Sequence, residues 1–290
     1  MDAFVSSARR KGSAVVVGLD PDPRHLPPEL LVRVRESALT EAEAVQEFCL
    51  GILEAVESEV AAVKLQLAYF ERLGPKGMGA YSDLIGASYA LGLPTIADAK
   101  RGDVGHVAST YAEAHLSVYG ATGVTVNPYM GADAVEPFLQ EARRLGRGGG
   151  VFVLVATSNS SALDIQDSST PPLYETASRL VGSLGEAGEA GYLDVGAVVG
   201  ATRPEVGRRV RELLPGALFL APGYGAQKGD AAGVGAMLDA RGAGVLVNSS
   251  RGILRAFEGR TSSAGGDYRS AARDAARRMR EDLEAAGVRA

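Results

Sequence analysis

Eight short apolar runs recur along the chain, and most of them do not alternate apolar with polar residues. They occupy residues 14–20, 60–66, 93–100, 123–127, 151–157, 194–200, 217–222 and 244–250. Runs of this length are typical of strands buried on both faces of a parallel sheet. Segments with helical spacing separate them, such as TEAEAVQEFCLGILEAV and RPEVGRRVRELL. This alternation predicts an α/β fold.

Two architectures repeat strand and helix in this way, the closed (β/α)8 or TIM barrel and the doubly wound open sheet. Eight strands within about 240 residues, with no GxGxxG after the first, favour the barrel. No boundary divides the chain, so we expect a single domain over residues 1–290. The last segment, about 266–288, predicts a terminal amphipathic helix with a solvated charged face.

Composition narrows the class of protein. The net charge is −5, with 22% charged and 46% apolar residues, which gives no support to nucleic-acid or anionic-membrane binding. A single cysteine, Cys49, rules out a disulfide framework, and three scattered histidines do not suggest a zinc site. No signal peptide or membrane span is evident. We expect a cytoplasmic protein.

Charged residues stand where several of the predicted strands end, and barrel enzymes place their active sites at these carboxyl ends. Asp20 closes the first run and Lys64 lies near the end of the second. The stretch IADAKRGDVG follows the third with Asp98, Lys100 and Asp103. Residues two apart on a strand share a face, so Asp98 and Lys100 project together, with Lys64 one strand away.

A buried ion-pair network that only fills the barrel is the alternative interpretation. Desolvation makes such networks poor stabilisers, so concentrated charge at this end favours a catalytic site.

The loops after the seventh and eighth strands form the usual phosphate site of a barrel. They contain Gly223, Gly225, Gln227 and Arg251. Glycines let backbone N–H groups approach an anion, and arginine presents a planar fork that suits phosphate. We therefore predict phosphate binding here, against the alternative that these are ordinary turns beside a surface arginine.

Taken together, these motifs resemble the orotidine 5′-phosphate decarboxylase family. DAKRGDVG fits its DxKxxD pattern, and GLDP, VKLQ, TSN, PGYGAQ and NSSRG follow in the family's order. The resemblance covers about residues 14–255 and is closest to the longer bacterial branch.

The resemblance implies a TIM-barrel homodimer that converts orotidine 5′-monophosphate to uridine 5′-monophosphate and CO2 without metal or organic cofactor. It implies that Lys64, Asp98 and Lys100 form a charged array that the partner's Asp103 completes, and that Lys100 protonates C6 of the pyrimidine. It further implies that Asp20 binds a ribose hydroxyl and Ser158 the pyrimidine ring. The phosphate would be held by Gln227 and Arg251 with the backbone at Gly223 and Gly225.

Two other functions stay open at this point. Mg²⁺-dependent sugar-phosphate aldolases and decarboxylases of the same superfamily share DxKxxD, but they typically carry a glutamate where Lys64 stands. An ammonium there would repel a metal whose ligands are oxygens. A nucleotide-binding protein without catalysis is the other alternative, although every expected charged position is filled. His106 and Val107 depart from the family pattern next to the expected dimer contact.

Overall fold

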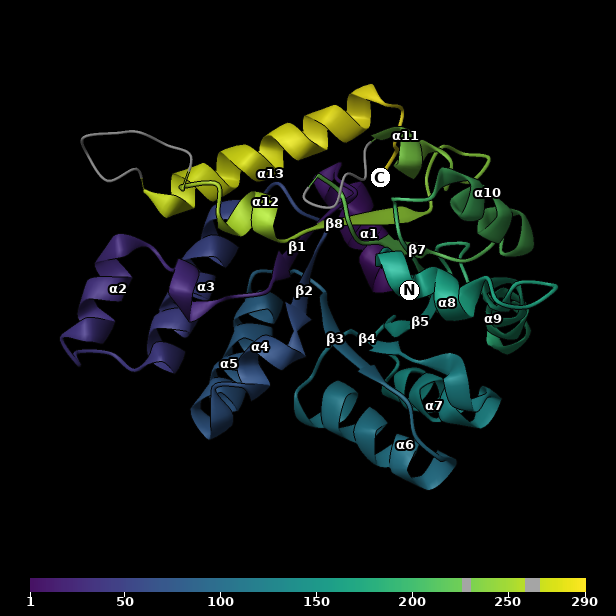
Figure 1. The fold of residues 1–290 in the computed structure, drawn as a ribbon, viewed down its shortest axis with the longest axis horizontal. Helices are drawn as coiled ribbons and strands as arrows, with labels where there is room; N and C mark the ends of the chain where they lie inside the picture. The colour runs from purple at the N-terminus through teal and green to yellow at the C-terminus, as the bar shows by residue number, and fades with distance from the viewer. Residues whose placement is uncertain (226–230, 259–266) are drawn as a thin grey trace.

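The eight runs form one closed parallel barrel with its strands in sequence order in a computed structural model of the chain (Figure 1). The structure describes residues 1–225, 231–258 and 267–290. The strands are β1 (Val15–Leu19), β2 (Ala62–Gln66), β3 (Thr95–Arg101), β4 (Gly123–Val126), β5 (Gly150–Ala156), β6 (Val195–Val199), β7 (Phe219–Ala221) and β8 (Val245–Ser249). Each overlaps one of the apolar runs, so the predicted single-domain (β/α)8 barrel is confirmed.

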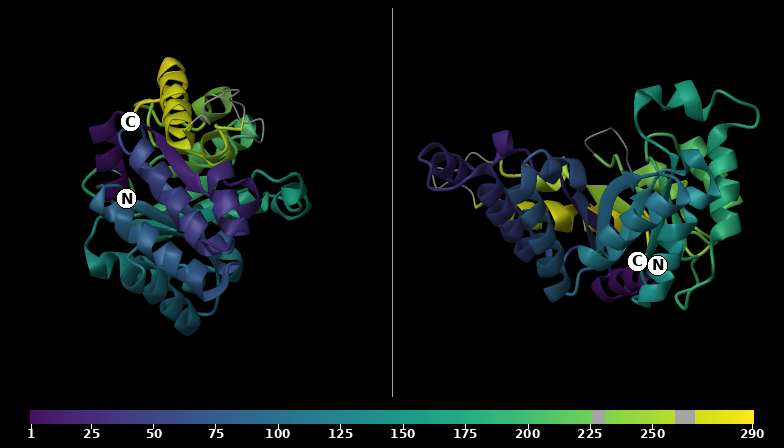
Figure 2. Two further views of the ribbon diagram at one scale, coloured as in Figure 1. Left: turned by 90° about the vertical axis from the view of Figure 1, so that its left-hand side faces the viewer. Right: turned by 90° about the horizontal axis from the view of Figure 1, so that it is seen from below.

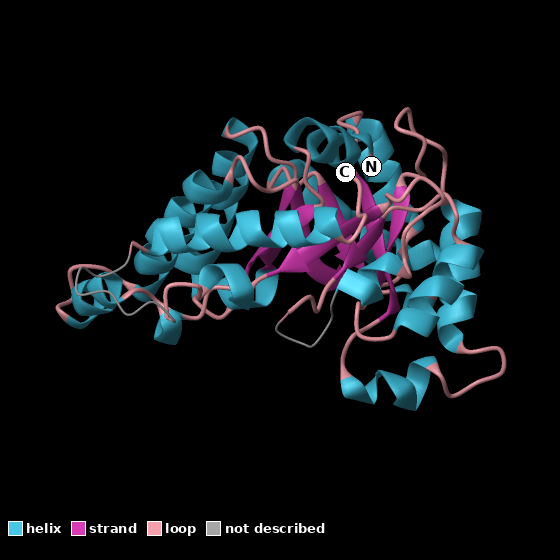
Figure 3. Ribbon diagram, turned by 90° about the horizontal axis from the view of Figure 1, so that it is seen from above, coloured by secondary structure: helices cyan, strands magenta, loops and turns pink. Residues whose placement is uncertain are grey.

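Helices surround the strands (Figure 3). The α-helices are α1 (Asp2–Lys11), α2 (Pro28–Arg35), α3 (Glu41–Val56), α4 (Leu67–Glu71), α5 (Gly74–Ala90), α6 (Gly105–Ala112), α7 (Glu136–Leu145), α8 (Leu163–Gln166), α9 (Leu173–Leu184), α10 (Pro204–Leu213), α11 (Ala231–Gly235), α12 (Arg251–Leu254) and α13 (Tyr268–Ala285). Short 3₁₀ turns are η1 (Pro23–His25), η3 (Pro128–Met130), η4 (Ala132–Ala134) and η5 (Ser160–Ala162), while η2 (Glu113–Val118) is π-helical.

Helix α3 shows how local sequence sets an element boundary. Thr40 accepts a hydrogen bond from the backbone N–H of Glu43, and the Glu43 carboxylate accepts one from the Thr40 backbone, which closes a capping box. The terminal helix α13 packs on α3, where the rings of Phe48 and Tyr268 lie 5.1 Å apart.

A helix that the sequence analysis did not predict, α1, closes the amino end of the barrel. Phe4 is fully buried and meets Phe152 of β5 edge to face, with ring centroids 5.5 Å apart. The cluster around Phe4 contains the inward side chains Val16, Ile96 and Leu246. This end is therefore filled with apolar side chains, which leaves the carboxyl end as the open one.

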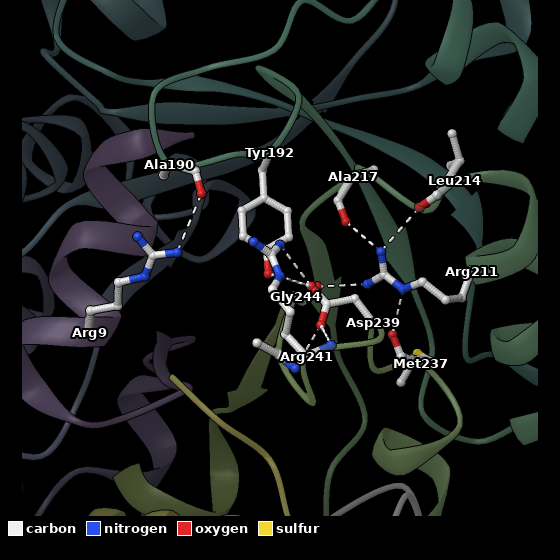
Figure 4. A network of polar contacts seen from close by, with 11 residues as sticks. Arg9, Ala190, Tyr192, Arg211, Leu214, Ala217, Met237, Asp239, Arg241 and Gly244 are labelled. Carbon is white, nitrogen blue, oxygen red and sulfur yellow. Dashed lines mark hydrogen bonds and ion pairs between the residues drawn. The ribbon is translucent and has the colours of Figure 1, made fainter.

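A buried arginine ties the amino ends of β7 and β8 together (Figure 4). The guanidinium of Arg211 donates to the carbonyls of Met237 and Ala217 at 2.7 Å each, Gly244 at 2.8 Å and Leu214 at 3.1 Å. Burial lowers its pKa to about 10, so the group stays charged at neutral pH. Two of the four carbonyls, those of Gly244 and Leu214, also accept a backbone N–H, so the guanidinium is their second donor.

The carboxyl-terminal residues Arg289 and Ala290 lie near Arg9 of α1, while the segment of η5 and α8 projects from the barrel (Figure 2). Within the described ranges, every helix is too short or too polar to span a membrane.

Candidate active site

A cavity of about 430 Å³ opens at the carboxyl ends of the strands. Seven of the residues predicted from the sequence line it, and they are Asp20, Lys64, Asp98, Lys100, Ser158, Gly223 and Arg251. The structure therefore brings together residues from six different strand ends. Gln227 lies outside the described residues, while Asp103 and Gly225 do not line this cavity.

Asp98 is the centre of a charged array on the cavity floor. Its Oδ2 accepts from the Lys64 ammonium at 2.8 Å, and its Oδ1 accepts from the Lys100 ammonium at 2.5 Å. Asp20 contacts Lys64 from the other side at 3.4 Å. Lys64 is 5% exposed, whereas Lys100 is 45% exposed at the mouth of the cavity. Of the two ammonium groups, Lys100 is thus the one that a bound molecule can reach more readily.

Two neutral side chains complete the coordination of Asp98, and the sequence analysis gave neither a role. Gln66 donates to Oδ2 at 2.9 Å, and the Thr125 hydroxyl donates to Oδ1 at 3.0 Å. Each carboxylate oxygen therefore accepts two hydrogen bonds. Strand parity could have found Gln66, because it lies two residues beyond Lys64 on β2 and so shares its face, whereas Thr125 lies opposite an irregular part of β3.

The charges stabilise one another despite burial. Burial alone would raise the pKa of Asp98, but the ammonium groups of Lys64 and Lys100 outweigh it and hold that pKa well below the usual range. Burial opposes the charge on Lys64 too, and Asp20 and Asp98 outweigh it, so the pKa of Lys64 is raised. Both shifts favour the charged forms of Asp98 and Lys64, which gives the site a fixed electrostatic field.

Apolar side chains face the array across the cavity. Leu154, Val198 and Leu220 come from β5, β6 and β7. Asn248 of β8 also lines the cavity, and its Oδ1 is buried without a hydrogen-bond partner. The cavity thus has one charged wall and one apolar wall, as a heterocycle with charged substituents would require.

Ser158 lies close to the end of β6, and the absence of a side chain at Gly200 makes this approach possible. A Cβ at Gly200 would lie 2.9 Å from both the Cα and the Cβ of Ser158, so a larger residue would displace the serine. The following loop is braced by Gln166, which accepts from the Thr157 N–H at 3.0 Å and donates to its hydroxyl at 2.7 Å. Both contacts fix the start of the loop that carries Ser158.

The predicted phosphate end is cationic and turn-rich. Gly223 and Gly225 have φ of 98° and 70°, values that favour glycine. Arg251 is exposed at the cavity, and its guanidinium makes no hydrogen bond or ion pair with another described residue. An uncommitted guanidinium in this place is available to an anion.

Asp103 lies apart from the array within its own chain. Its carboxylate accepts from the N–H of Val104 at 2.8 Å, and no described contact joins it to Lys64 or Lys100. Large apolar side chains are exposed nearby, with Val104 at 42%, Tyr129 at 81% and Met130 at 45%.

Metal ligands are not grouped in the described part of the chain, where no three His, Cys, Asp or Glu side chains are placed to share an ion. The cation at the cavity floor is instead the Lys64 ammonium, which hydrogen-bonds to both carboxylates around it.

Comparisons with known proteins agree with this geometry. The family model described as orotidine 5′-phosphate decarboxylase / HUMPS matches residues 13–264. The chain is 41% identical to orotidine 5′-phosphate decarboxylase of Rhodopirellula baltica over 95% of each chain, and 37% identical to that of Clostridium kluyveri over 98% of this chain and 96% of the relative. The solved OMP decarboxylase of Leishmania donovani superposes with a TM-score of 0.78 at 33% identity, covering 99% of this chain and 98% of that one.

Proposed function

Because this chain belongs to the orotidine 5′-phosphate decarboxylase / HUMPS family, its reaction is the decarboxylation of orotidine 5′-monophosphate, and we propose that Lys100 supplies the proton. The product is uridine 5′-monophosphate, so the enzyme serves UMP biosynthesis. The observation that carries the residue assignment is the Asp98 carboxylate, bonded to two ammonium groups on the floor of the cavity.

The difficulty of this reaction lies in the carbanion. Loss of CO2 leaves an electron pair at C6 in the plane of the ring, where the ring π system delocalises it poorly. The C6–carboxyl bond breaks, its electron pair stays on C6, and a proton from the Lys100 ammonium then forms the C6–H bond. A fixed cation beside C6 favours the charge as it develops and needs no reorganisation.

Asp98 serves the same step in two ways. Its charge directs the Lys100 ammonium by a hydrogen bond, and we propose that it also lies against the substrate carboxylate and disfavours it before CO2 leaves. Lys64 balances Asp98 from below and, with Asp20, faces the ribose hydroxyls.

The remaining predicted contacts hold the substrate away from the reacting bond. We propose that Ser158 contacts the pyrimidine and that Arg251 grips the 5′-phosphate with backbone groups near Gly223 and Gly225. Gln227 stays a prediction, because it lies outside the described residues. Binding energy from the phosphate offsets the cost of placing the substrate carboxylate near Asp98.

We further propose that the active form is a homodimer in which Asp103 enters the partner's site. Among the described residues, the Asp103 carboxylate accepts one hydrogen bond, from the adjacent backbone, and the large apolar side chains of Val104, Tyr129 and Met130 are exposed. Apolar side chains exposed beside a site are typical of an interface. The effect of His106 and Val107 on that contact, and a cytoplasmic location, stay predictions.

A Mg²⁺-dependent sugar-phosphate enzyme is the alternative within the family. Lys64 opposes it, because a buried ammonium that bonds to both Asp20 and Asp98 occupies the position where a divalent cation would need oxygen ligands.

The test is turnover in excess EDTA. Purified protein is mixed with orotidine 5′-monophosphate, the loss of substrate absorbance is followed, and uridine 5′-monophosphate is identified by chromatography. Conversion in EDTA supports the proposal. No conversion, together with activity on a hexulose 6-phosphate once Mg²⁺ is added, would assign the chain to the metal-dependent branch.

A further inference from the structure

We propose that Arg101 is a positioning residue for the reaction, because its guanidinium, anchored outside the barrel, keeps Lys100 in the backbone conformation that directs its ammonium at Asp98. This inference rests on the proposed role of Lys100, and nothing in the sequence analysis gave Arg101 a function.

Lys100 has a strained backbone. Its φ is 48°, and among the described residues other than glycine only Ser37, which follows α2, also has a positive φ. The left-handed region is unfavourable for a residue other than glycine, because the Cβ comes too close to the following carbonyl oxygen. Such strain persists only where the surroundings hold it, and it gathers at functional sites.

The strain lies within a bulge at the end of β3. Ala97 pairs with Val124 and Arg101 pairs with Val126, so residues 98–100 of β3 stand opposite Thr125 alone. The N–H of Lys100 donates to the Thr125 hydroxyl at 2.9 Å, and the carbonyl of Arg101 accepts from the N–H of Asn127 at 2.7 Å. The backbone is thus pinned immediately before and after the Lys100 side chain.

The Arg101 side chain pins the same point from the helical layer. Its Nη2 donates to Glu71 Oε1 at 2.7 Å at the end of α4, and its Cζ lies 5.0 Å from the ring centroid of Tyr111 in α6. An ion pair this exposed adds little to stability. Two contacts on different helices do, however, fix the direction of the side chain and hence the place of its Cα.

The surroundings of Arg101 destabilise the folded state, because they contain buried polar atoms without hydrogen-bond partners. Its Nε, the Tyr81 hydroxyl and His115 Nδ1 are three of the four buried side-chain polar atoms that lack a hydrogen-bond partner in the described ranges. The Tyr119 ring joins the last two, at 5.2 Å from the Tyr81 ring and 6.1 Å from that of His115. An apolar side chain at position 101 would remove one such cost, so stability alone does not explain an arginine here.

The test separates position from stability. Arg101→Met removes the charge and both anchors, and Arg101→Lys keeps the charge. We expect Arg101→Met to lower kcat by roughly 10- to 100-fold, with KM within about threefold of the original value. Arg101→Lys should recover part of the loss. Arg144→Met is the matched control, because it removes an arginine whose ion pair with Glu141 lies outside the site, and kcat should not change.

Two further measurements make each outcome decisive. The crystal structure of Arg101→Met should show Lys100 outside the left-handed region, and Glu71→Gln, which leaves Arg101 in place, should lower kcat in the same direction by a smaller factor. Unchanged kcat in folded Arg101→Met, or an unchanged φ at Lys100, would overturn the inference. Failure of the unaltered protein to act on orotidine 5′-monophosphate would overturn the proposed function instead, while the φ of Lys100 in the variant would still decide the role of Arg101.

Discussion

At the scale of single residues, the site depends on one carboxylate with four donors. The buried Asp98 carboxylate accepts four hydrogen bonds, two on each oxygen. The donors are Lys64, Lys100, Gln66 and Thr125. The charge also separates two ammonium groups that would otherwise repel one another.

Replacing this carboxylate with an amide should therefore damage catalysis more than folding. We expect Asp98→Asn to lower kcat by roughly 100- to 1,000-fold, because Lys100 loses the charge that directs it. Steady-state kinetics with orotidine 5′-monophosphate measure the loss. Asp83→Asn, which removes an exposed carboxylate bonded to Gln46, is the control. Equal kcat in the two variants would contradict this role for Asp98.

His115, which is buried outside the active site, makes the stability of the folded chain depend on pH. Burial, and then the charge of Arg101, lower its pKa to about 4. Between that value and its ordinary pKa the unfolded chain binds the extra proton, so the folded state loses stability as the pH falls. We expect a loss of about 3 kcal/mol between pH 6.5 and pH 4. Urea unfolding at several pH values gives the free energy of unfolding of the original protein and of His115→Gln. This free energy should fall more steeply with falling pH in the original protein, and equal pH dependence in the two proteins would contradict this role for His115.

The sequence was informative about residues where strand parity and charge agree. Asp98, Lys100, Lys64 and Asp20 lie together as expected. Parity says nothing about a residue in a left-handed bulge, so the conformation of Lys100 and the role of Arg101 could not be predicted. Tertiary contacts hold both in place, and no local preference for the left-handed region exists for lysine.

At the scale of elements, the strands were easier to predict than helix α1, which covers the amino end of the barrel. Runs such as 151–157 are apolar on both faces, and this pattern is typical of strands in a parallel sheet covered on both sides. Helix α1 was missed because its apolar residues, Phe4 and Val5 among them, occupy a short first turn whose partner is the barrel interior. Only the folded barrel shows that its amino end exposes apolar side chains, which α1 shields from water.

The Arg211 network yields a prediction about stability. Arg211→Met would remove one donor from each of four carbonyls, two of which keep a backbone donor, and would remove the cation from the Phe219 ring, 3.7 Å away. We expect the free energy of unfolding to fall by about 4 kcal/mol. The KM for substrate should hold, because the network lies at the closed end of the barrel. Denaturant unfolding measures the change, and Arg277→Met, which breaks an exposed pair with Asp274, should stay within about 0.5 kcal/mol of the original protein.

At the scale of the whole molecule, one chain holds the array but does not bring Asp103 to it. Two variants that are inactive alone test whether a second chain does so. Lys100→Ala and Asp103→Ala each damage both sites of their own dimer, whereas a mixed dimer has one intact site. After subunit exchange an equal mixture should regain about a quarter of the original activity. A mixture no more active than its components would show that Asp103 is not shared.

The most direct test of the account compares the turnover of orotidine 5′-monophosphate in EDTA by the original protein and by Lys100→Ala, with folding of both checked by thermal unfolding. The account predicts that the original protein forms uridine 5′-monophosphate and that the folded variant is slower by at least roughly 1,000-fold, since it loses both the proton donor and the fixed cation. Turnover by the variant within tenfold of the original protein would show that the proton and the stabilising charge come from elsewhere.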